Sequence, residues 1–197
     1  MIKLLQIFIF CFLVNLAEAR YFNTVVIDPG HGGRDKGAYW GGVRESHLNM
    51  IVANKLAYEL KARGIKVVMT RKSDRTTSYS SRTNLANRYP GAIFVSVHFN
   101  ASTNTSVKGI ETFYLSREGR KIATQVQGRL ASSLKSRNRG VKSANFKVLR
   151  STNAPAILVE CGFISNPSER MRCSTRWYQS TAARVIAEGL MKYRKMK

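Results

Sequence analysis

Two apolar stretches of the sequence end in the same way, each with a histidine at the point where a β-strand would stop. Val25 to Ile27 is followed by Asp28-Pro29-Gly30 and then by His31. Further along the chain, Ile93 to Val97 runs directly into His98. Short apolar runs bounded by Gly and Pro are typical of buried strands, and sites in open α/β sheets form at the carboxyl ends of strands. We therefore expect a sheet that brings both histidines to one edge.

The rest of the chain alternates between helical and strand spacing of apolar residues. Helices are expected over residues 45–63, 78–89 and 117–136 and in a last helix that includes 178–193. Strands are expected over residues 65–70, 109–115 and 156–159, with a further short strand over 146–149. This alternation predicts an α/β fold with helices on both faces of a largely parallel or mixed sheet. A chain of 197 residues, without an internal repeat or linker, suits a single domain.

The N-terminus reads as a removable secretory signal. A short basic start, Met1-Ile2-Lys3, precedes the apolar run Leu4 to Leu16, and Ala17-Glu18-Ala19 matches a cleavage site with small residues. The apolar run is too short to span a bilayer comfortably, so we expect no membrane span after the signal is removed. Residues 1–19 are thus predicted to be the signal peptide and residues 20–197 the mature domain, exported to the periplasm or the cell wall.

The chain is strongly basic, with a formal net charge of +22. Such a charge indicates attraction to polyanions and says little about fold. Because the chain is predicted to be exported, we expect anionic wall polymers and not nucleic acid as the partner, although a generally solvated basic surface would look the same. Of the cysteines, Cys161 and Cys173 fall in the mature domain. They permit one disulfide, but two separate thiols are equally compatible with the sequence.

A carboxylate joins the two histidines as a candidate metal ligand. Glu45 follows His31 by 14 positions and lies at the start of a predicted helix. Two imidazoles and one carboxylate, with a fourth position left for water, form the ligand set of a catalytic zinc site. A single histidine at a strand end is more often a structural residue. The residues alone therefore leave both a metal site and structural histidines open.

Glu160 is a fourth candidate, because it follows the apolar run Ile157 to Val159 directly. It could cap the strand or form a salt bridge there. If this strand runs parallel to those that carry the histidines, however, the carboxylate faces the same cleft and could accept a proton from an attacking water and give it to a leaving amine. No dinucleotide fingerprint or phosphate-binding loop is present. Cys161 would point to the opposite side of the strand, which argues against a catalytic thiol.

Several dispersed blocks resemble one family. They are VVIDPGHGGRDKGA, VRESHLN, SSRTNLAN, FVSVHFNAS, GIETFYLS and PAILVECGFISNPSE, in this order. Together they resemble the zinc-dependent N-acetylmuramoyl-L-alanine amidases of the amidase-3 family, over about residues 23–193. The resemblance implies a single α/β domain with a mixed, roughly six-stranded sheet. It also implies hydrolysis of the amide between the lactyl group of N-acetylmuramic acid and L-alanine in peptidoglycan, which serves wall remodelling, turnover or daughter-cell separation.

The resemblance assigns roles residue by residue. His31, Glu45 and His98 match the ligands of one Zn²⁺ per chain, and Glu160 matches the catalytic glutamate. Asn100 is expected to help position the substrate. Cell-division members of the family carry an inserted helix that blocks the zinc site, after the strand that matches residues 109–115. Here Leu115-Ser116 leads directly into a basic helix, so an open site is expected.

Two other functions are compatible with these residues. One is a basic wall-binding protein that kept the fold and lost activity, and the other is a zinc peptidase that cuts within the stem peptide. Both alternatives would bind peptidoglycan. We expect a monomer in each case.

Overall fold

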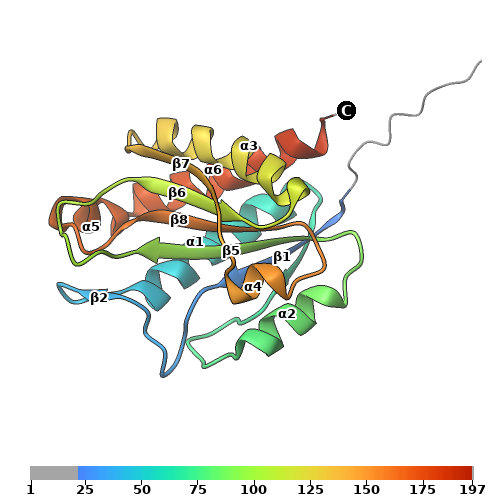
Figure 1. Ribbon diagram of the computed structural model, residues 1–197, viewed down its shortest axis with the longest axis horizontal. Helices are drawn as coiled ribbons and strands as arrows, with labels where there is room; N and C mark the ends of the chain where they lie inside the picture. Colours follow the sequence, from blue (N-terminus) through green and yellow to red (C-terminus); the bar gives the residue numbers. More distant parts are fainter. Residues whose placement is uncertain (1–21, 197) are drawn as a thin grey trace, which may run out of the picture.

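The computed structural model describes residues 22–196 and has a six-stranded sheet through its middle (Figure 1). The strands are β1 (Thr24–Pro29), β4 (Lys66–Met69), β5 (Ile93–Asn100), β6 (Ile110–Tyr114), β7 (Asn138–Ser143) and β8 (Ala156–Phe163). Their order across the sheet is β4-β1-β5-β8-β6-β7. β6 runs antiparallel to β8, whereas the other neighbouring strands pair in parallel. The predicted mixed sheet is therefore confirmed.

Helices cover both faces of this sheet, as predicted (Figure 1). The longer helices α1 (Glu45–Lys61), α3 (Arg117–Ser133) and α6 (Arg176–Arg194) lie together on one face. The shorter helices α2 (Tyr79–Asn87) and α4 (Lys147–Arg150) lie on the other. The remaining elements are α5 (Pro167–Cys173) and a small antiparallel pair, β2 (Tyr39–Trp40) and β3 (Val43–Arg44). Within residues 22–196, no helix combines the length and the apolar composition needed to cross a bilayer.

Alternation along the central strands divides the core into two clusters. In β5, Val95 and Val97 pack in the larger cluster with α1, α3 and α6. Phe94 packs in the smaller cluster, which includes Leu158 of β8 and apolar residues of α2 and α4. Successive side chains of a strand point to opposite faces, so His98 lies on the same face as Phe94. α2 and α4 are short, and this leaves the carboxyl ends of β5 and β8 uncovered on that face.

Three features differ from the sequence-based expectation. Residues 146–149 do not form the expected short strand. Phe146 instead precedes the short helix α4, where its carbonyl accepts bonds from the amides of Leu149 and Arg150 at 2.9 and 3.0 Å. The physical reason is that Val148 and Leu149 are neighbours in sequence and both are buried, which a helical turn permits and a strand with one buried face does not. Neither β7 nor the β2–β3 pair was predicted, because both are polar or very short.

Side-chain caps begin two of the helices, and the start of α3 at Arg117 agrees with the expected helix over residues 117–136. Asn166 caps α5 by accepting a hydrogen bond from the Glu169 amide at 3.0 Å, with Pro167 in the first turn. Ser116 caps α3 by accepting from the Gly119 amide at 3.0 Å. Since β6 ends at Tyr114 and α3 begins at Arg117, the chain has no inserted helix at this position. The predicted signal segment, residues 1–19, lies outside the described residues.

Candidate metal centre

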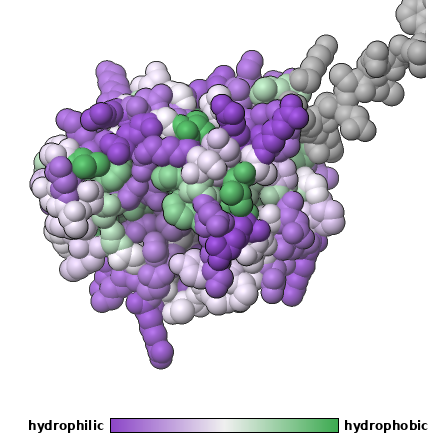
Figure 2. Space-filling model, in the orientation of Figure 1, coloured by the Kyte–Doolittle hydropathy of each residue, from purple (hydrophilic) through white to green (hydrophobic). Residues whose placement is uncertain are grey.

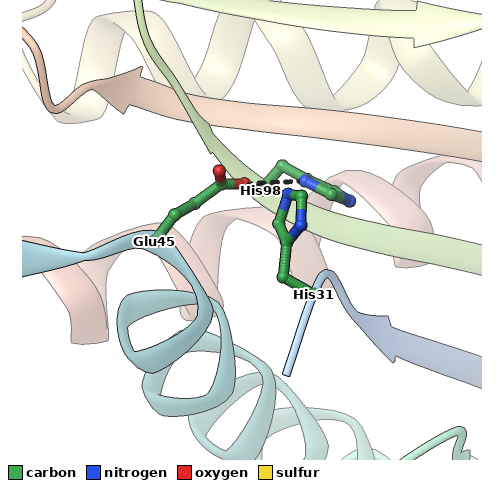
Figure 3. Close-up of side chains that lie close together, drawn as sticks. All are labelled: His31, Glu45 and His98. Carbon is green, nitrogen blue, oxygen red and sulfur yellow. Dashed lines mark hydrogen bonds and ion pairs between the residues drawn. The ribbon is translucent and has the colours of Figure 1, made fainter. Parts of the chain in front are cut away.

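His31, Glu45 and His98 come together from three different elements (Figure 3). His31 lies in the loop after β1, Glu45 is the first residue of α1, and His98 lies near the carboxyl end of β5. Figure 3 shows the three side chains pointing toward one another. One possible ligand atom from each lies within 4.8 Å of the others, so the three residues could hold a metal ion. The expectation that one sheet edge receives both histidines is confirmed.

The loop between β1 and α1 makes this approach possible through its backbone. His31 adopts a left-handed conformation, with φ of 59°, which a non-glycine residue rarely does. Gly30 lies so close to His98 that a Cβ atom there would be 2.2 Å from the imidazole. At Gly37, where φ is 64°, a Cβ atom would be 2.6 Å from both Glu45 and His31. The loop therefore requires glycine at these two positions.

The donor atoms are spaced as a metal site requires. Glu45 Oε1 lies 3.1 Å from His31 Nε2 and 2.8 Å from His98 Nδ1. Bonds of about 2.0–2.1 Å in a tetrahedral zinc site place neighbouring ligand atoms about 3.3 Å apart. The two nitrogens and the carboxylate oxygen thus need to move only slightly to bind one ion. Two imidazoles and a carboxylate also match the ligand chemistry of zinc.

Further hydrogen bonds orient two of these side chains. His31 Nδ1 lies 2.8 Å from Asp35 Oδ2, so it can donate its proton there and present Nε2 to the centre. Glu45 Oε2 accepts from the Ala38 amide at 2.9 Å, and Glu45 Oε1 accepts from Asn49 Nδ2 at 3.3 Å. These contacts hold the His31 ring and the Glu45 carboxylate in place, and the Asp35 bond favours the tautomer that leaves Nε2 to bind an ion.

The charges of the centre are strongly coupled. Burial alone raises the pKa of Glu45, but hydrogen bonds from His31 and His98 outweigh it and hold that pKa far below its ordinary value. Burial alone lowers the pKa of His31, yet the carboxylates of Glu45 and Asp35 outweigh it and raise that pKa. The Glu45 carboxylate is therefore ionised at neutral pH. Its negative charge favours a cation at the centre, either a proton on His31 or a bound metal ion.

Glu160 lies beside the centre on β8 and is in register with His98 on β5. It does not join the three residues that could hold a metal. Its Oε2 atom is buried and has no hydrogen-bond partner within residues 22–196. Burial, followed by the negative charges of Glu45 and Glu111, raises the pKa of Glu160 well above its ordinary value. A buried carboxylate oxygen without a partner is costly, and it indicates a place where a ligand, water or proton is expected.

Two buried arginines hold the loop that carries His31, and sequence reasoning missed both. Arg71 donates to the carbonyls of Pro29, Gly30 and Ser46, each at 2.9 Å. Arg82 of α2 donates to the Pro29 carbonyl at 2.8 Å and to the His31 carbonyl at 2.7 Å. Arg82 lies within the block SSRTNLAN, whose resemblance to the family assigns this residue no role of its own.

A buried carboxylate completes this support. Asp28 Oδ1 accepts from Thr70 Oγ1 at 2.6 Å and from Arg82 Nη1 at 2.7 Å. Its Oδ2 accepts from Ser96 Oγ at 2.8 Å. In the sequence, Asp28 marks only the end of an apolar run. Its tight neighbours lie more than forty residues away along the chain, so no local pattern marks it.

The remaining histidine of the chain, His47, is exposed on α1 and lies outside the group that could hold a metal. The role of Asn100 in positioning the substrate stays a prediction. Asn100 donates from Nδ2 to Glu111 Oε1 at 2.8 Å, at the carboxyl end of β5. Cys161 packs in the larger core cluster, on the face opposite Glu160 as expected. Both Cys161 and Cys173 are buried free thiols.

Comparison with known proteins points to one family. The model of the N-acetylmuramoyl-L-alanine amidase family matches residues 25–192. The chain is 36% identical over 174 residues to the N-acetylmuramoyl-L-alanine amidase LytC of Bacillus subtilis, covering 86% of this chain but only 35% of LytC. It is also 36% identical over 181 residues to the uncharacterized protein YqiI of the same organism, covering 90% of this chain and 87% of YqiI.

Solved structures show the same fold. An N-acetylmuramoyl-L-alanine amidase from Clostridium difficile 630 aligns with a TM-score of 0.83 and 42% identity, over 86% of this chain and 95% of that one. The catalytic domain of CwlV, an amidase from Bacillus (Paenibacillus) polymyxa var. colistinus, aligns with a TM-score of 0.85 and 32% identity, over 89% of this chain and all of that domain. The predicted architecture is confirmed by this similarity.

Proposed function

The chain belongs to the N-acetylmuramoyl-L-alanine amidase family, and from this premise we propose that it is a zinc-dependent hydrolase of peptidoglycan. The bond that it cleaves joins the lactyl group of N-acetylmuramic acid to L-alanine, and the products are stem peptide and glycan. The observation that carries the proposal is the convergence of His31, Glu45 and His98 beside Glu160, whose Oε2 has no hydrogen-bond partner among residues 22–196. The substrate is inferred from the family, and the roles of the side chains are inferred from their arrangement.

His31, Glu45 and His98 would hold the metal ion in this proposal. A zinc ion bound there supplies Lewis-acid chemistry, since it polarises a carbonyl and lowers the pKa of water to about 7. Three protein ligands leave a coordination position for a reactant, as in other catalytic zinc sites. The side chains of His31 and His98 are 22% and 16% exposed, so a reactant can reach the centre from solvent.

Glu160 would move the proton. Its buried Oε2 faces no protein partner in residues 22–196, so it is free to accept a proton from the attacking water. Its raised pKa then favours keeping that proton until the amine leaves, and Glu160 can donate it to the departing nitrogen of L-alanine. Burial serves both steps, because it weakens the hydration that would otherwise stabilise the ionised carboxylate.

Export and wall attachment also belong to the proposal. Peptidoglycan lies outside the cytoplasmic membrane, which agrees with residues 1–19 acting as a secretory signal and residues 20–197 as the exported amidase domain. The formal charge of +22 would hold the enzyme near anionic wall polymers. Figure 2 shows hydrophilic side chains over most of the face that carries α2 and α4, with small separate apolar patches.

Product analysis of digested peptidoglycan tests the reaction. Purified protein incubated with peptidoglycan should release intact stem peptides and leave a free lactyl carboxyl on the sugar, both identifiable by mass spectrometry. A chelator should stop the reaction, and added Zn²⁺ should restore it. Shortened peptides would instead indicate a peptidase, and tight wall binding without any product would indicate a non-catalytic wall protein.

Two substitutions separate the proposed roles. Glu160→Gln should keep about one zinc per chain, measured by metal analysis, while its turnover falls by roughly 10²–10⁴-fold. His98→Ala should lose the metal itself. A Glu160→Gln enzyme that works near the wild-type rate would remove Glu160 from the mechanism and leave the metal assignment intact.

A further inference from the structure

A cavity of about 300 Å³ adjoins the candidate metal centre on the face that α2 and α4 cover only in part. His31, His98 and Glu160 line it. The first residues of α2 and the start of α4 line it as well, and there Tyr79 and Phe146 contribute aromatic rings. These rings are 52% and 40% exposed, which is high for large side chains. A group bound in this cavity would therefore lie directly beside the scissile bond.

The lining of this cavity is suited to an uncharged group. Asp28 and Arg82 both line it, but they form an ion pair at 2.7 Å and satisfy each other. The ammonium of Lys147 lies 5.5 Å from the centroid of the Tyr79 ring. Asp35 also lines the cavity, and its carboxylate bonds the His31 ring at 2.8 Å. Phe146, Val148 and Leu158 contribute apolar surface to the wall, and ligand pockets combine such surface with a few placed polar groups.

One such polar group is Thr77, which also lines the cavity. Its Oγ1 atom is buried and has no hydrogen-bond partner within residues 22–196. Buried hydroxyl groups are nearly always paired, so this atom is expected to bond to something absent from the chain itself. A hydroxyl or an amide of a ligand would satisfy it.

On the other side of the centre, beyond Glu160, the side chains of β6 and β7 carry excess positive charge. Residues paired across neighbouring strands share one face of the sheet, and the pairs His98–Glu160 and Glu160–Glu111 extend the row from β5 to β6. Glu111 is contacted at its Oε2 by Arg139 Nε at 3.0 Å and by Lys142 Nζ at 2.5 Å. Two cations against one buried carboxylate leave an excess of positive charge beyond Glu160. This side is suited to an anion.

We propose that the cavity between α2 and α4 is the subsite for the N-acetylmuramoyl sugar, and that the stem peptide extends across β8 toward Arg139 and Lys142. The inference rests on the proposed amidase function, which supplies a substrate with two chemically different halves. The sugar is uncharged once its lactyl carboxyl is in the amide, and it offers C–H faces for aromatic rings and hydroxyls for Thr77. The peptide carries carboxylates, which the cationic side can bind.

Two substrates with the same scissile amide test the subsite. One is an N-acetylmuramoyl tripeptide, and the other is the D-lactoyl tripeptide, which lacks the sugar ring. The wild-type enzyme should prefer the first by kcat/KM, measured from the released peptide. Tyr79→Ala should reduce this preference about fivefold, because it removes the ring on which the sugar would pack. Tyr58→Ala, which changes a tyrosine on α1 that is 73% exposed and does not line the cavity, should leave the preference unchanged.

Thr77→Val provides a second variant that keeps the shape of the side chain. Loss of an orphaned hydroxyl should leave the thermal midpoint unchanged or raise it, while the preference for the sugar-bearing substrate falls about threefold or more. Equal losses of kcat/KM on both substrates in Tyr79→Ala and Thr77→Val would overturn the sugar subsite and leave the amidase function standing. A wild-type enzyme that releases no intact stem peptide from any substrate would overturn both.

Discussion

At the scale of single residues, the candidate centre depends on a glycine without a side chain and on a histidine with an unusual backbone conformation. Gly30 provides the space in which the His98 ring lies, and His31 takes up a left-handed backbone conformation to face it. A non-glycine residue in this conformation costs about 1–3 kcal/mol and persists only where its surroundings hold it. Here Arg82 bonds the His31 carbonyl and Asp35 bonds its ring. The site is therefore organised before a metal binds.

Gly30→Ala tests the need for that space. The added methyl group would lie 2.2 Å from the His98 imidazole, so the ring must move away from Glu45. We expect zinc affinity, measured by competition with a chelator dye, to fall at least tenfold. Gly128→Ala in α3 is the matched control, because its Cβ would meet nothing within 4 Å. Helix propensity predicts that this control gains up to about 1 kcal/mol in stability and binds zinc normally.

Glu160 should lower the stability of the metal-free protein in a pH-dependent way. Its pKa is raised on folding above the ordinary value of 4.5, so the folded state binds the extra proton. The free energy of unfolding is then unaffected below pH 4.5 and falls as the pH rises toward the folded pKa. Glu160→Gln removes this loss, and it should stabilise the chelated protein at neutral pH by roughly 1–3 kcal/mol.

Urea denaturation of both proteins at pH 4 and pH 7, in chelator, measures the effect. The gain should be close to zero at pH 4 and present at pH 7. Glu188→Gln, which removes one partner of an exposed ion pair on α6, should change the stability little at either pH. A gain of the same size at both pH values would mean that packing, and not titration, explains it.

At the scale of elements, α2 supports the site although none of its residues could bind the metal in the described chain. Arg82 is almost fully buried, and from α2 it bonds Asp28 together with the carbonyls of Pro29 and His31. Its guanidinium is satisfied by four acceptors in all, since Nε also donates to the Thr77 carbonyl at 3.1 Å. This one side chain joins the helix, the end of β1 and the metal-binding loop.

Arg82→Leu should therefore both destabilise the fold and loosen the loop. Removing one partner of a buried ion pair leaves Asp28 uncompensated, which costs about 3–5 kcal/mol in the free energy of unfolding. Denaturant unfolding measures this loss, and zinc affinity should decrease with it. Arg184→Leu breaks an exposed pair with Glu188 and should cost less than about 1 kcal/mol. Similar losses in the two variants would contradict the supporting role of Arg82.

Elements also show where sequence patterns lose information. The long helices and the apolar strands were predictable, because periodic burial leaves a periodic pattern. β7 was not, since an edge strand with the sequence Asn138 to Ser143 buries little and contains mostly polar residues. Residues 146–149 are expected to be a strand, although α4 covers Lys147–Arg150, because a single helical turn is too short to show a period. Short or exposed elements are defined by their tertiary neighbours.

At the scale of the whole molecule, the net charge determines the long-range electrostatic attraction between the protein and anionic polymers. A charge of +22 on 197 residues creates a long-range field that salt screens. Binding to cell walls that carry anionic polymers should weaken steeply as NaCl increases from about 0.05 M to about 0.5 M, measured by co-sedimentation. Walls stripped of these polymers should retain less protein at low salt. Attachment that salt does not affect would point to a specific contact instead.

The sequence by itself determined the fold class, the two histidine-bearing strand ends, the acidic helix start and the family. Each of these is local: a run of apolar residues, a helical period, or a short block such as FVSVHFNAS. The identity of the candidate ligands follows from residue types at the ends of such runs. Patterns of this kind can be read from the sequence because residues close together in the chain produce them.

Only the tertiary structure decided how these parts act together. It brought Glu45 Oε1 within 3.1 Å of both imidazoles and buried Arg71 and Arg82 around the loop. It also left Glu160 Oε2 and Thr77 Oγ1 without hydrogen-bond partners in the part of the chain that the structure describes. It also placed the cavity beside the centre and the cations of β7 beyond it. The physical reason is that hydrogen bonds, burial and cavities depend on distances between residues far apart in the chain, and sequence spacing does not contain those distances.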